Sequence, residues 1–280
     1  MVLRLISATT VTAFAVAASA ATVNVLFVGD DLLLGDFSTG GVPAVFKDMA
    51  DRIPDLIDTY NVTIQATSGF TLQDHFEKSA AVIGQPQWNW IYLQEQTTLV
   101  LPDEQGGNHE RFAEGVKNLQ SLIQNTSNAH ISLFQNWLLP GLVYPAGAPY
   151  NQDVYQCGED LPNIICMQGD ISDSLASVSV GFDIGDVAFP GNSFLWSIDD
   201  GIADGNPYDG VEAGINLWAD DNVKASKAGA YVAALSLLAN IASFAPSDVP
   251  NGVNSTADAL GISSDVATEL QARIEWIARS

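Results

Sequence analysis

Five short apolar runs recur along this chain, separated by segments of helical length. The runs are rich in β-branched and aromatic residues and lie near 23–29, 61–66, 88–94, 130–135 and 183–188. Helices are expected near 42–53, 71–83, 107–125, 168–180, 226–243 and 263–278. Strands alternating with helices predict a parallel sheet covered on both faces, which is a three-layer α/β/α sandwich. The segment 189–222 is rich in Gly, Asp, Asn and Pro, so we expect loops there, at the edge of the sheet that holds the site.

The N-terminal segment differs from the rest. Arg4 precedes a stretch rich in Leu, Val and Ala, and Ala18-Ser19-Ala20 fits the small-x-small pattern of signal peptidase. We expect residues 1–20 to be a signal peptide and residues 21–280 to form one domain, secreted or periplasmic after cleavage. The apolar stretch is too short and too rich in alanine for a membrane anchor, and no later segment is apolar enough to span a bilayer.

The charge balance disfavours two classes of partner. Lys and Arg number 10 against 33 Asp and Glu, a formal net charge of −23. Such a chain repels nucleic acid phosphates and anionic lipid. No cofactor is predicted, and the oligomeric state stays open.

Cys157 and Cys166 lie close together in the segment QCGEDLPNIIC. A local, even pair in an exported protein is typical of a disulfide that closes its own loop. A metal site needs His or further Cys nearby, and none is adjacent, so we predict the disulfide.

Polar residues follow three of the expected strands. In parallel sheets, ligands bind beyond the carboxyl ends of the strands. The three polar groups at these ends are Gly29-Asp30-Asp31, Gln94-Glu95-Gln96 and Gln135-Asn136-Trp137.

Six segments, in order, resemble the conserved blocks of the SGNH (GDSL-type) hydrolase superfamily. They are FVGDDLLLGDF, TSGFTLQDH, WNWIYLQEQTT, ISLFQNWLLPG, VAFPGNSFL and LWADDNVKASKAGAYVAA. The resemblance covers most of the mature chain and is closest to an exported branch with G-N-S and L-Q-E-Q-S blocks. It implies a flavodoxin-like α/β/α fold and a serine esterase site.

The resemblance also assigns roles by position. Asp31 stands where the family has its nucleophilic serine, and Lys224 stands where it has the general-base histidine. Asp221 matches the orienting acid, and Gly69 and Gln96 match donors of the oxyanion hole. The oxyanion positions keep their chemistry, whereas the two reacting positions do not.

The double replacement predicts an ion pair instead of a catalytic hydrogen bond. A carboxylate has no proton for a base to remove, so serine-type activation has no meaning at Asp31. Lys224, with an ordinary pKa of about 10.4, stays protonated beside carboxylates. We therefore expect ester hydrolysis by this site to be absent or very weak.

Two alternatives remain open. In the first, the chain is a hydrolase of carbohydrate or carboxylic esters that uses Asp31 as nucleophile or as base for a water. That alternative predicts a desolvated Asp31 with Lys224 too far away to neutralise it. In the second, the fold is only a scaffold, and the 189–222 loop or aromatic side chains fill the cleft.

The expected ligand is a carbohydrate or another small extracellular molecule such as an ester. Asp30, Glu95, Trp137 and Trp218 are candidate binding residues because they follow strands or lie in loops. The acidic residues of the loop 199–210 suit Ca²⁺, but a solvated acidic loop is the favoured interpretation, and no metal is predicted. Of the histidines, only His75 is placed to reach the rim of the site, and packing or surface roles are the default for all of them.

Overall fold

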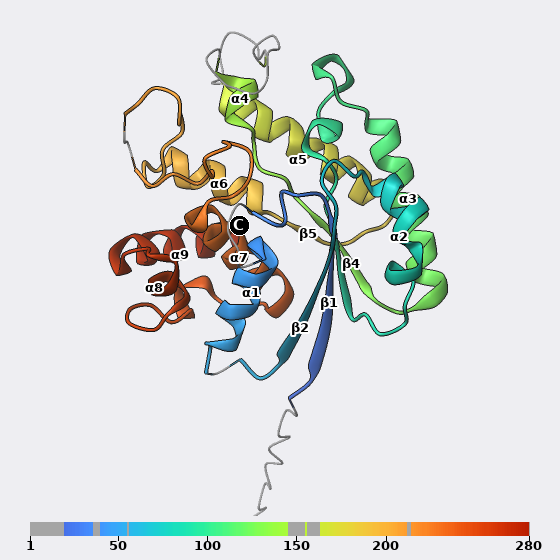
Figure 1. Cartoon of the computed structure of the whole chain (residues 1–280), viewed down its shortest axis with the longest axis horizontal. Helices are drawn as coiled ribbons and strands as arrows, with labels where there is room; N and C mark the ends of the chain where they lie inside the picture. The colour runs from blue at the N-terminus through green and yellow to red at the C-terminus, as the bar shows by residue number, and fades with distance from the viewer. Residues whose placement is uncertain are drawn as a thin grey trace, which may run out of the picture.

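The computed structural model describes residues 20–35, 40–54, 56–144, 155, 163–211 and 214–279. Its centre is a five-stranded sheet in the order β2-β1-β3-β4-β5, in which every pairing is parallel (Figure 1). The strands are β1 Thr22–Gly29, β2 Thr59–Ala66, β3 Trp90–Leu93, β4 His130–Phe134 and β5 Val187–Ala188. This strand order is that of flavodoxin-like folds, and it confirms the predicted three-layer α/β/α sandwich.

Helices cover both faces of the sheet (Figure 1). One face carries α1 Gly41–Asp51 and α7 Lys227–Ala242, backed by α6 Pro190–Asp199, α8 Thr256–Leu260 and α9 Ser264–Arg279. The other carries α2 Leu72–Ile83, α3 His109–Thr126 and α5 Asn163–Gly181. The short helix α4, Pro140–Val143, follows β4, and single 3-10 turns span Thr97–Val100, Asp103–Gln105 and Pro246–Asp248.

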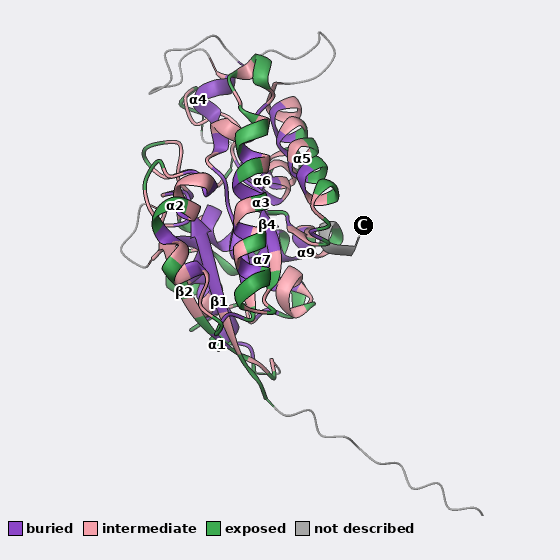
Figure 2. Cartoon of the chain, turned by 90° about the vertical axis from the view of Figure 1, so that its right-hand side faces the viewer, coloured by how far each residue is buried: buried purple, intermediate pink, exposed green. Residues whose placement is uncertain are grey.

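The core lies around β1 and α7. Residues Val25 to Val28 of β1 have no exposed surface, as expected of a central strand covered on both faces (Figure 2). Helix α7 is apolar all round because it lies between the sheet and the outer helices, and its residues 229–238 are buried. Tyr92 of β3 ties these parts together, since its ring stacks on Phe27 at 4.9 Å and its hydroxyl donates to Asn240.

The expectation of loops throughout 189–222 is wrong for Pro190–Asp199, which form α6. Pro190 occupies the first turn, where a missing N–H costs nothing. Two tertiary contacts fix the helix: the N–H of Asn192 donates to the Gln135 side chain at 2.8 Å, and Phe194 is fully buried. Neither contact is visible in a local pattern dominated by Pro, Gly and Asn.

Two expectations concern segments outside the described residues. The expected signal peptide spans residues 1–20, of which 1–19 are not described, so it stays a prediction. Cys157 is not described either, while Cys166 lies in α5, so the disulfide stays a prediction. Across the described part of the chain, no helix combines the length and apolarity needed to cross a membrane.

The space around two helical glycines predicts opposite effects for their replacement by alanine. A Cβ at Gly115 of α3 would lie 2.8 Å from the backbone nitrogen of Gln73, so Gly115→Ala is expected to lower the free energy of unfolding by about 1–3 kcal/mol. A Cβ at Gly169 of α5 meets nothing within 4 Å, so Gly169→Ala should instead raise it by up to about 1 kcal/mol. Urea unfolding measures both, and a stabilising Gly115→Ala would contradict the close α2–α3 contact.

Candidate functional site

The turn after β1 is held by buried contacts of Gly29 and Asp30. The Gly29 carbonyl accepts from the backbone of Thr67 at 3.1 Å and from His75 Nε2 at 2.8 Å. The N–H of Asp30 donates to Gln94 Oε1 at 2.8 Å, and a Cβ at position 29 would lie only 2.2 Å from that oxygen. Only glycine allows this approach, which explains why β1 ends in Gly before the turn.

Asp30 turns the chain so that Asp31 faces outward. Asp30 Oδ1 accepts from the backbone of Leu32 at 3.0 Å, a local side-chain-to-backbone turn. Asp30 itself is only 4% exposed, whereas the Asp31 side chain is 35% exposed. The two neighbouring carboxylates therefore have different environments: the first supports the turn and the second faces solvent.

A short hairpin delivers Lys224 to the same edge. Trp218 and Ala225 form an isolated antiparallel bridge, and Ala219 N–H donates to the Lys224 carbonyl at 2.8 Å. Asp221 Oδ1 accepts from the backbone of both Val223 and Lys224 at 2.9 Å. Asp221, at the orienting-acid position, thus closes the turn that carries Lys224, at the general-base position.

The three positions assigned to the reaction lie together in the structure. Lys224 Nζ lies 3.2 Å from Asp221 Oδ2 and 3.8 Å from Asp31 Oδ2. Burial raises the pKa of Asp221, but the N–H groups of Lys224 and Val223 and the Lys224 ammonium outweigh it, so the pKa lies below its usual range. We call Asp31, Lys224 and Asp221 the ion cluster.

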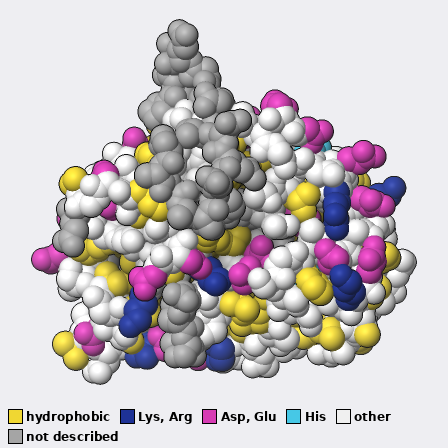
Figure 3. Space-filling model, turned by 45° about the horizontal axis from the view of Figure 1, so that its top comes forward, with side chains coloured by type: hydrophobic (Ala, Val, Ile, Leu, Met, Phe, Trp, Pro, Cys, Tyr) yellow, Lys and Arg dark blue, Asp and Glu magenta, His cyan; other side chains and the backbone are white. Residues whose placement is uncertain are grey.

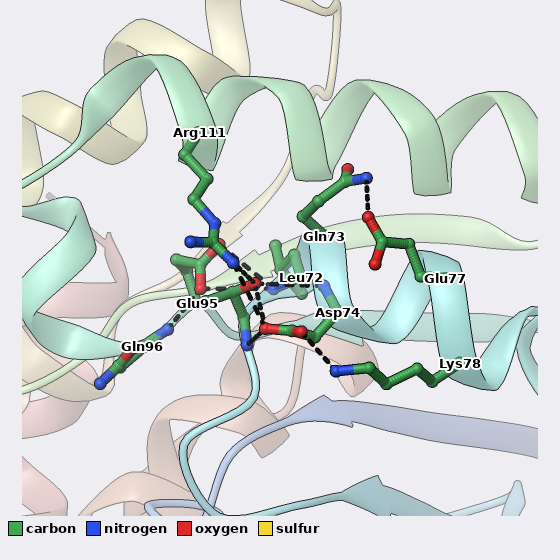
Figure 4. A network of polar contacts seen from close by, with 9 residues as sticks. Leu72, Gln73, Asp74, Glu77, Lys78, Glu95, Gln96 and Arg111 are labelled. Carbon is green, nitrogen blue, oxygen red and sulfur yellow. Dashed lines mark hydrogen bonds and ion pairs between the residues drawn. The ribbon is translucent and has the colours of Figure 1, made fainter.

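Glu95 has a structural position at the end of β3. Its carboxylate accepts from the N–H of Leu72, the first residue of α2, at 3.2 Å and from the N–H of Gln96 at 2.8 Å (Figure 4). It is 2% exposed, so Asp30 and Glu95, both predicted to bind ligand, are instead buried beneath the edge. The guanidinium of Arg111 on α3 lowers the pKa of Glu95 without offsetting burial.

Both buried carboxyl groups have raised pKa values. Burial raises the pKa of Glu95 to about 8, with the charge of Asp30 adding to the effect. Burial, with the charge of Asp31, raises the pKa of Asp30 to about 7. Burial thus disfavours ionisation of both acids, and the charge of Asp30 further disfavours ionisation of Glu95.

The two oxyanion positions lie in the turns after β2 and β3. Gly69 is exposed and adopts a φ of 72°, a left-handed conformation that glycine tolerates without strain. The N–H of Gln96 is committed to Glu95, and its half-buried side chain points away from the Glu95–Leu72 contacts (Figure 4).

Trp137 and Trp218, expected to line a pocket, lie in the core with 0% and 1% exposure. Trp137 stacks on Phe194 of α6 at 4.9 Å, and Trp218 meets the same ring edge-on. Trp137 Nε1 also donates to the Val223 carbonyl at 2.9 Å. Trp137 therefore helps to position Lys224 from the core, through its hydrogen bond to the preceding residue, Val223.

Each of the three histidines has a hydrogen-bond partner away from the ion cluster. His75, for which a packing or surface role was the default expectation, is fully buried, and its Nδ1 lies 3.3 Å from Ser79 Oγ. Burial lowers the pKa of His75, so a neutral ring donates from Nε2 to Gly29. His109 contacts Ser174 at 3.1 Å, and His130 pairs with Asp186 at 3.0 Å.

The acidic residues are not arranged as a metal site in the described residues. No group of three or more His, Cys, Asp or Glu there is placed to hold an ion. In the 199–210 loop, Asp204 and Asp209 accept from backbone N–H groups two residues ahead of each, which is the pattern of turn-forming aspartates. Figure 3, which brings the top of the view in Figure 1 forward, shows acidic side chains spread over the visible surface.

The two buried acids predict a particular pH dependence of stability. A carboxyl whose pKa is higher in the folded chain holds its proton longer there, so stability falls as pH rises through the folded pKa. Between pH 6.5 and pH 9 we expect the free energy of unfolding to fall by about 2–3 kcal/mol. The lowered pKa of His75 acts in the opposite direction, because the ring is about half protonated in the unfolded chain at pH 6.5, and it offsets only about 0.4 kcal/mol of this fall.

Urea unfolding of Glu95→Gln at the two pH values isolates the effect. The variant keeps an acceptor for an N–H group and should lose most of the pH dependence, whereas Glu110→Gln, at an exposed carboxyl, should keep it. Equal stability of the unsubstituted chain at pH 6.5 and 9 would contradict the buried-acid account.

No protein-family model and no curated protein matches this chain. Its structure is similar to LAE5, an α/β hydrolase enzyme from the metagenome of Lake Arreo in Spain, with a TM-score of 0.52 and 15% identity over 79% of this chain and 95% of that one. It is also similar to a mutant of Axe2, an acetyl-xylooligosaccharide esterase from Geobacillus stearothermophilus, with a TM-score of 0.52 and 14% identity over 78% and 93% of the two chains. Together with the strand order and the site at its carboxyl edge, these similarities establish that the chain has the fold of the SGNH (GDSL-type) esterases.

Proposed function

We propose that this chain is an exported SGNH-fold protein that binds a neutral carbohydrate at the ion cluster and does not hydrolyse esters there. The observation that carries the proposal is the position of Lys224 Nζ between Asp221, at 3.2 Å, and Asp31, at 3.8 Å. Asp31 and Lys224 form an ion pair at the two positions where an esterase of this fold needs a serine and a neutral histidine.

The nucleophile position supports this proposal first. Serine catalysis requires a hydroxyl proton that a base removes in the attack, and Asp31 has none. The adjacent ammonium also stabilises the Asp31 carboxylate electrostatically, which reduces its tendency to form a bond to a carbonyl carbon.

The base position supports it second. Two carboxylates flank the Lys224 ammonium, which is attracted to both. No histidine replaces Lys224 as base, because all three rings have partners elsewhere. A water at this site therefore finds no neutral amine or imidazole of the described residues to accept its proton.

The two alternatives fit the geometry less well. A hydrolase using Asp31 needs a desolvated carboxylate distant from Lys224, but the side chain is 35% exposed and the ammonium lies 3.8 Å away. A pure scaffold predicts a covered edge, but Asp31, Asp221 and Lys224 keep 35%, 37% and 25% of their side-chain surface exposed.

Charge and the fold comparison support a neutral carbohydrate as ligand. The ion cluster offers carboxylate acceptors and ammonium donors, which suit hydroxyl groups. A net charge of −23 disfavours an anionic ligand. The similar enzyme Axe2 is an acetyl-xylooligosaccharide esterase, so xylo-oligosaccharides are the first ligands to test. The signal-peptide pattern of residues 1–20 supports export to where such ligands occur.

The proposal predicts no Asp31-dependent esterase activity. With 4-nitrophenyl acetate or acetylated xylo-oligosaccharides, the unsubstituted chain and Asp31→Ala should show the same background rate, measured by release of nitrophenolate or acetate. A normal turnover rate that Asp31→Ala abolishes would overturn the proposal. The double variant Asp31→Ser, Lys224→His restores the reacting groups of the family and should exceed the unsubstituted chain by at least about tenfold.

The proposal also predicts binding without turnover. Isothermal titration calorimetry with xylotetraose should give saturable binding to the unsubstituted chain, weakened about tenfold or more in Lys224→Ala, which leaves Asp31 and Asp221 unneutralised. The matched control is Lys117→Ala on α3, outside the ion cluster, which should bind normally. Equal affinity of Lys224→Ala and the unsubstituted chain would show that the ligand does not bind at the ion cluster.

A further inference from the structure

Two tryptophans and an arginine form a cluster where α6 packs against α9, outside the ion cluster. The rings of Trp196 on α6 and Trp276 on α9 meet edge to face, with centroids 5.7 Å apart. The guanidinium carbon of Arg273, one turn before Trp276, lies 4.8 Å and 5.0 Å from the two ring centres. Trp276 is 53% exposed, which is unusual for a side chain of this size.

The arginine in this cluster has hydrogen-bond donors left over. Its Nε lies 2.9 Å from Asp200 Oδ2, an ion pair without the geometry of a hydrogen bond. Among the described residues, neither Nη atom of Arg273 has a hydrogen-bond partner. Asp200 is itself 39% exposed and offers further acceptor positions. An exposed aromatic face thus lies next to both donors and an acceptor.

The cluster is held in place before any ligand arrives. Arg273 is only 18% exposed, and its contacts with both rings and with Asp200 restrict its rotamers. Helical spacing puts Arg273 and Trp276 on the same side of α9. Because a ligand would not have to order these side chains, little entropy is lost on binding.

We propose that Trp276, Arg273, Trp196 and Asp200 form a surface platform that binds neutral pyranose units of a polysaccharide. The apolar C–H face of a pyranose stacks on an exposed indole. Its hydroxyl oxygens accept hydrogen bonds from the Arg273 guanidinium, and its hydroxyl groups donate to the Asp200 carboxylate. This platform lies apart from the ion cluster and does not rest on the function proposed for it.

The charge and the size of the platform favour a neutral sugar over an acidic polymer or a protein partner. Asp200 neutralises Arg273, and the chain carries a net charge of −23, so an acidic polymer is repelled. A stable protein partner needs about 800 Å² on each side. Within the described residues, Trp276 is the only large apolar side chain of this cluster counted as exposed, and that is too little for such an interface.

Affinity electrophoresis with soluble arabinoxylan or soluble β-glucan in the gel tests the platform. The unsubstituted chain should be retarded by at least one of these neutral polymers, and Trp276→Ala should weaken the apparent affinity about tenfold or more. Trp276→Tyr keeps an aromatic face and should retain most of the retardation. Because Trp276 is more than half exposed and loses only its contacts with Trp196 and Arg273, Trp276→Ala should stay folded and unfold only a few degrees lower.

Two further variants separate this platform from other causes. Phe189→Ala, at a 44% exposed aromatic before α6, should leave retardation unchanged, and Asp31→Ala measures any separate contribution of the ion cluster. The proposal is overturned by absence of retardation in both polymers, by retardation of Trp276→Ala equal to that of the unsubstituted chain, or by an equal loss in Phe189→Ala. A loss in Asp31→Ala alone would place polysaccharide binding at the ion cluster and overturn the platform.

Discussion

The turn that ends β1 depends on polar groups buried beneath the surface. The strand has no exposed surface over Val25 to Val28, so the backbone groups at its end must find partners inside the protein. The Gly29 carbonyl is bonded by His75 and Thr67, and the Asp30 N–H is bonded by Gln94. These contacts join β1 to β2, β3 and α2, and they determine where Asp31 emerges.

Lys224 reaches Asp31 through a second set of contacts that begins in the core. Trp137 stacks on Phe194 and donates to Val223, while the Asp221 carboxylate closes the turn around the same residue. Residues that resemble catalytic or binding positions by sequence thus have two kinds of role. Trp137, Glu95 and Asp30 build the edge, whereas Asp31, Lys224 and Asp221 face solvent on it.

Periodicity was enough to predict the fold, and the resemblance to the SGNH hydrolases predicted the meeting of Asp31 with Lys224. All five predicted strands form, because apolar runs between helices have few alternatives to a buried parallel sheet. Helix α6 was missed since its stability comes from Gln135 and from burial of Phe194, not from local propensity. The burial of Trp137 and the contact of Glu95 with the first turn of α2 could not be predicted from local sequence either, because both depend on packing between distant segments.

The central claim is that Asp31 and Lys224 interact as an ion pair where an esterase of this fold has a serine and a histidine. A double-mutant cycle with Asp31→Asn and Lys224→Gln, measured by urea unfolding, tests it most directly. For a partly exposed pair at 3.8 Å, the account predicts a favourable coupling energy of about 0.5–1 kcal/mol at low salt that shrinks at high salt. Strict additivity of the two substitutions at low salt would contradict it.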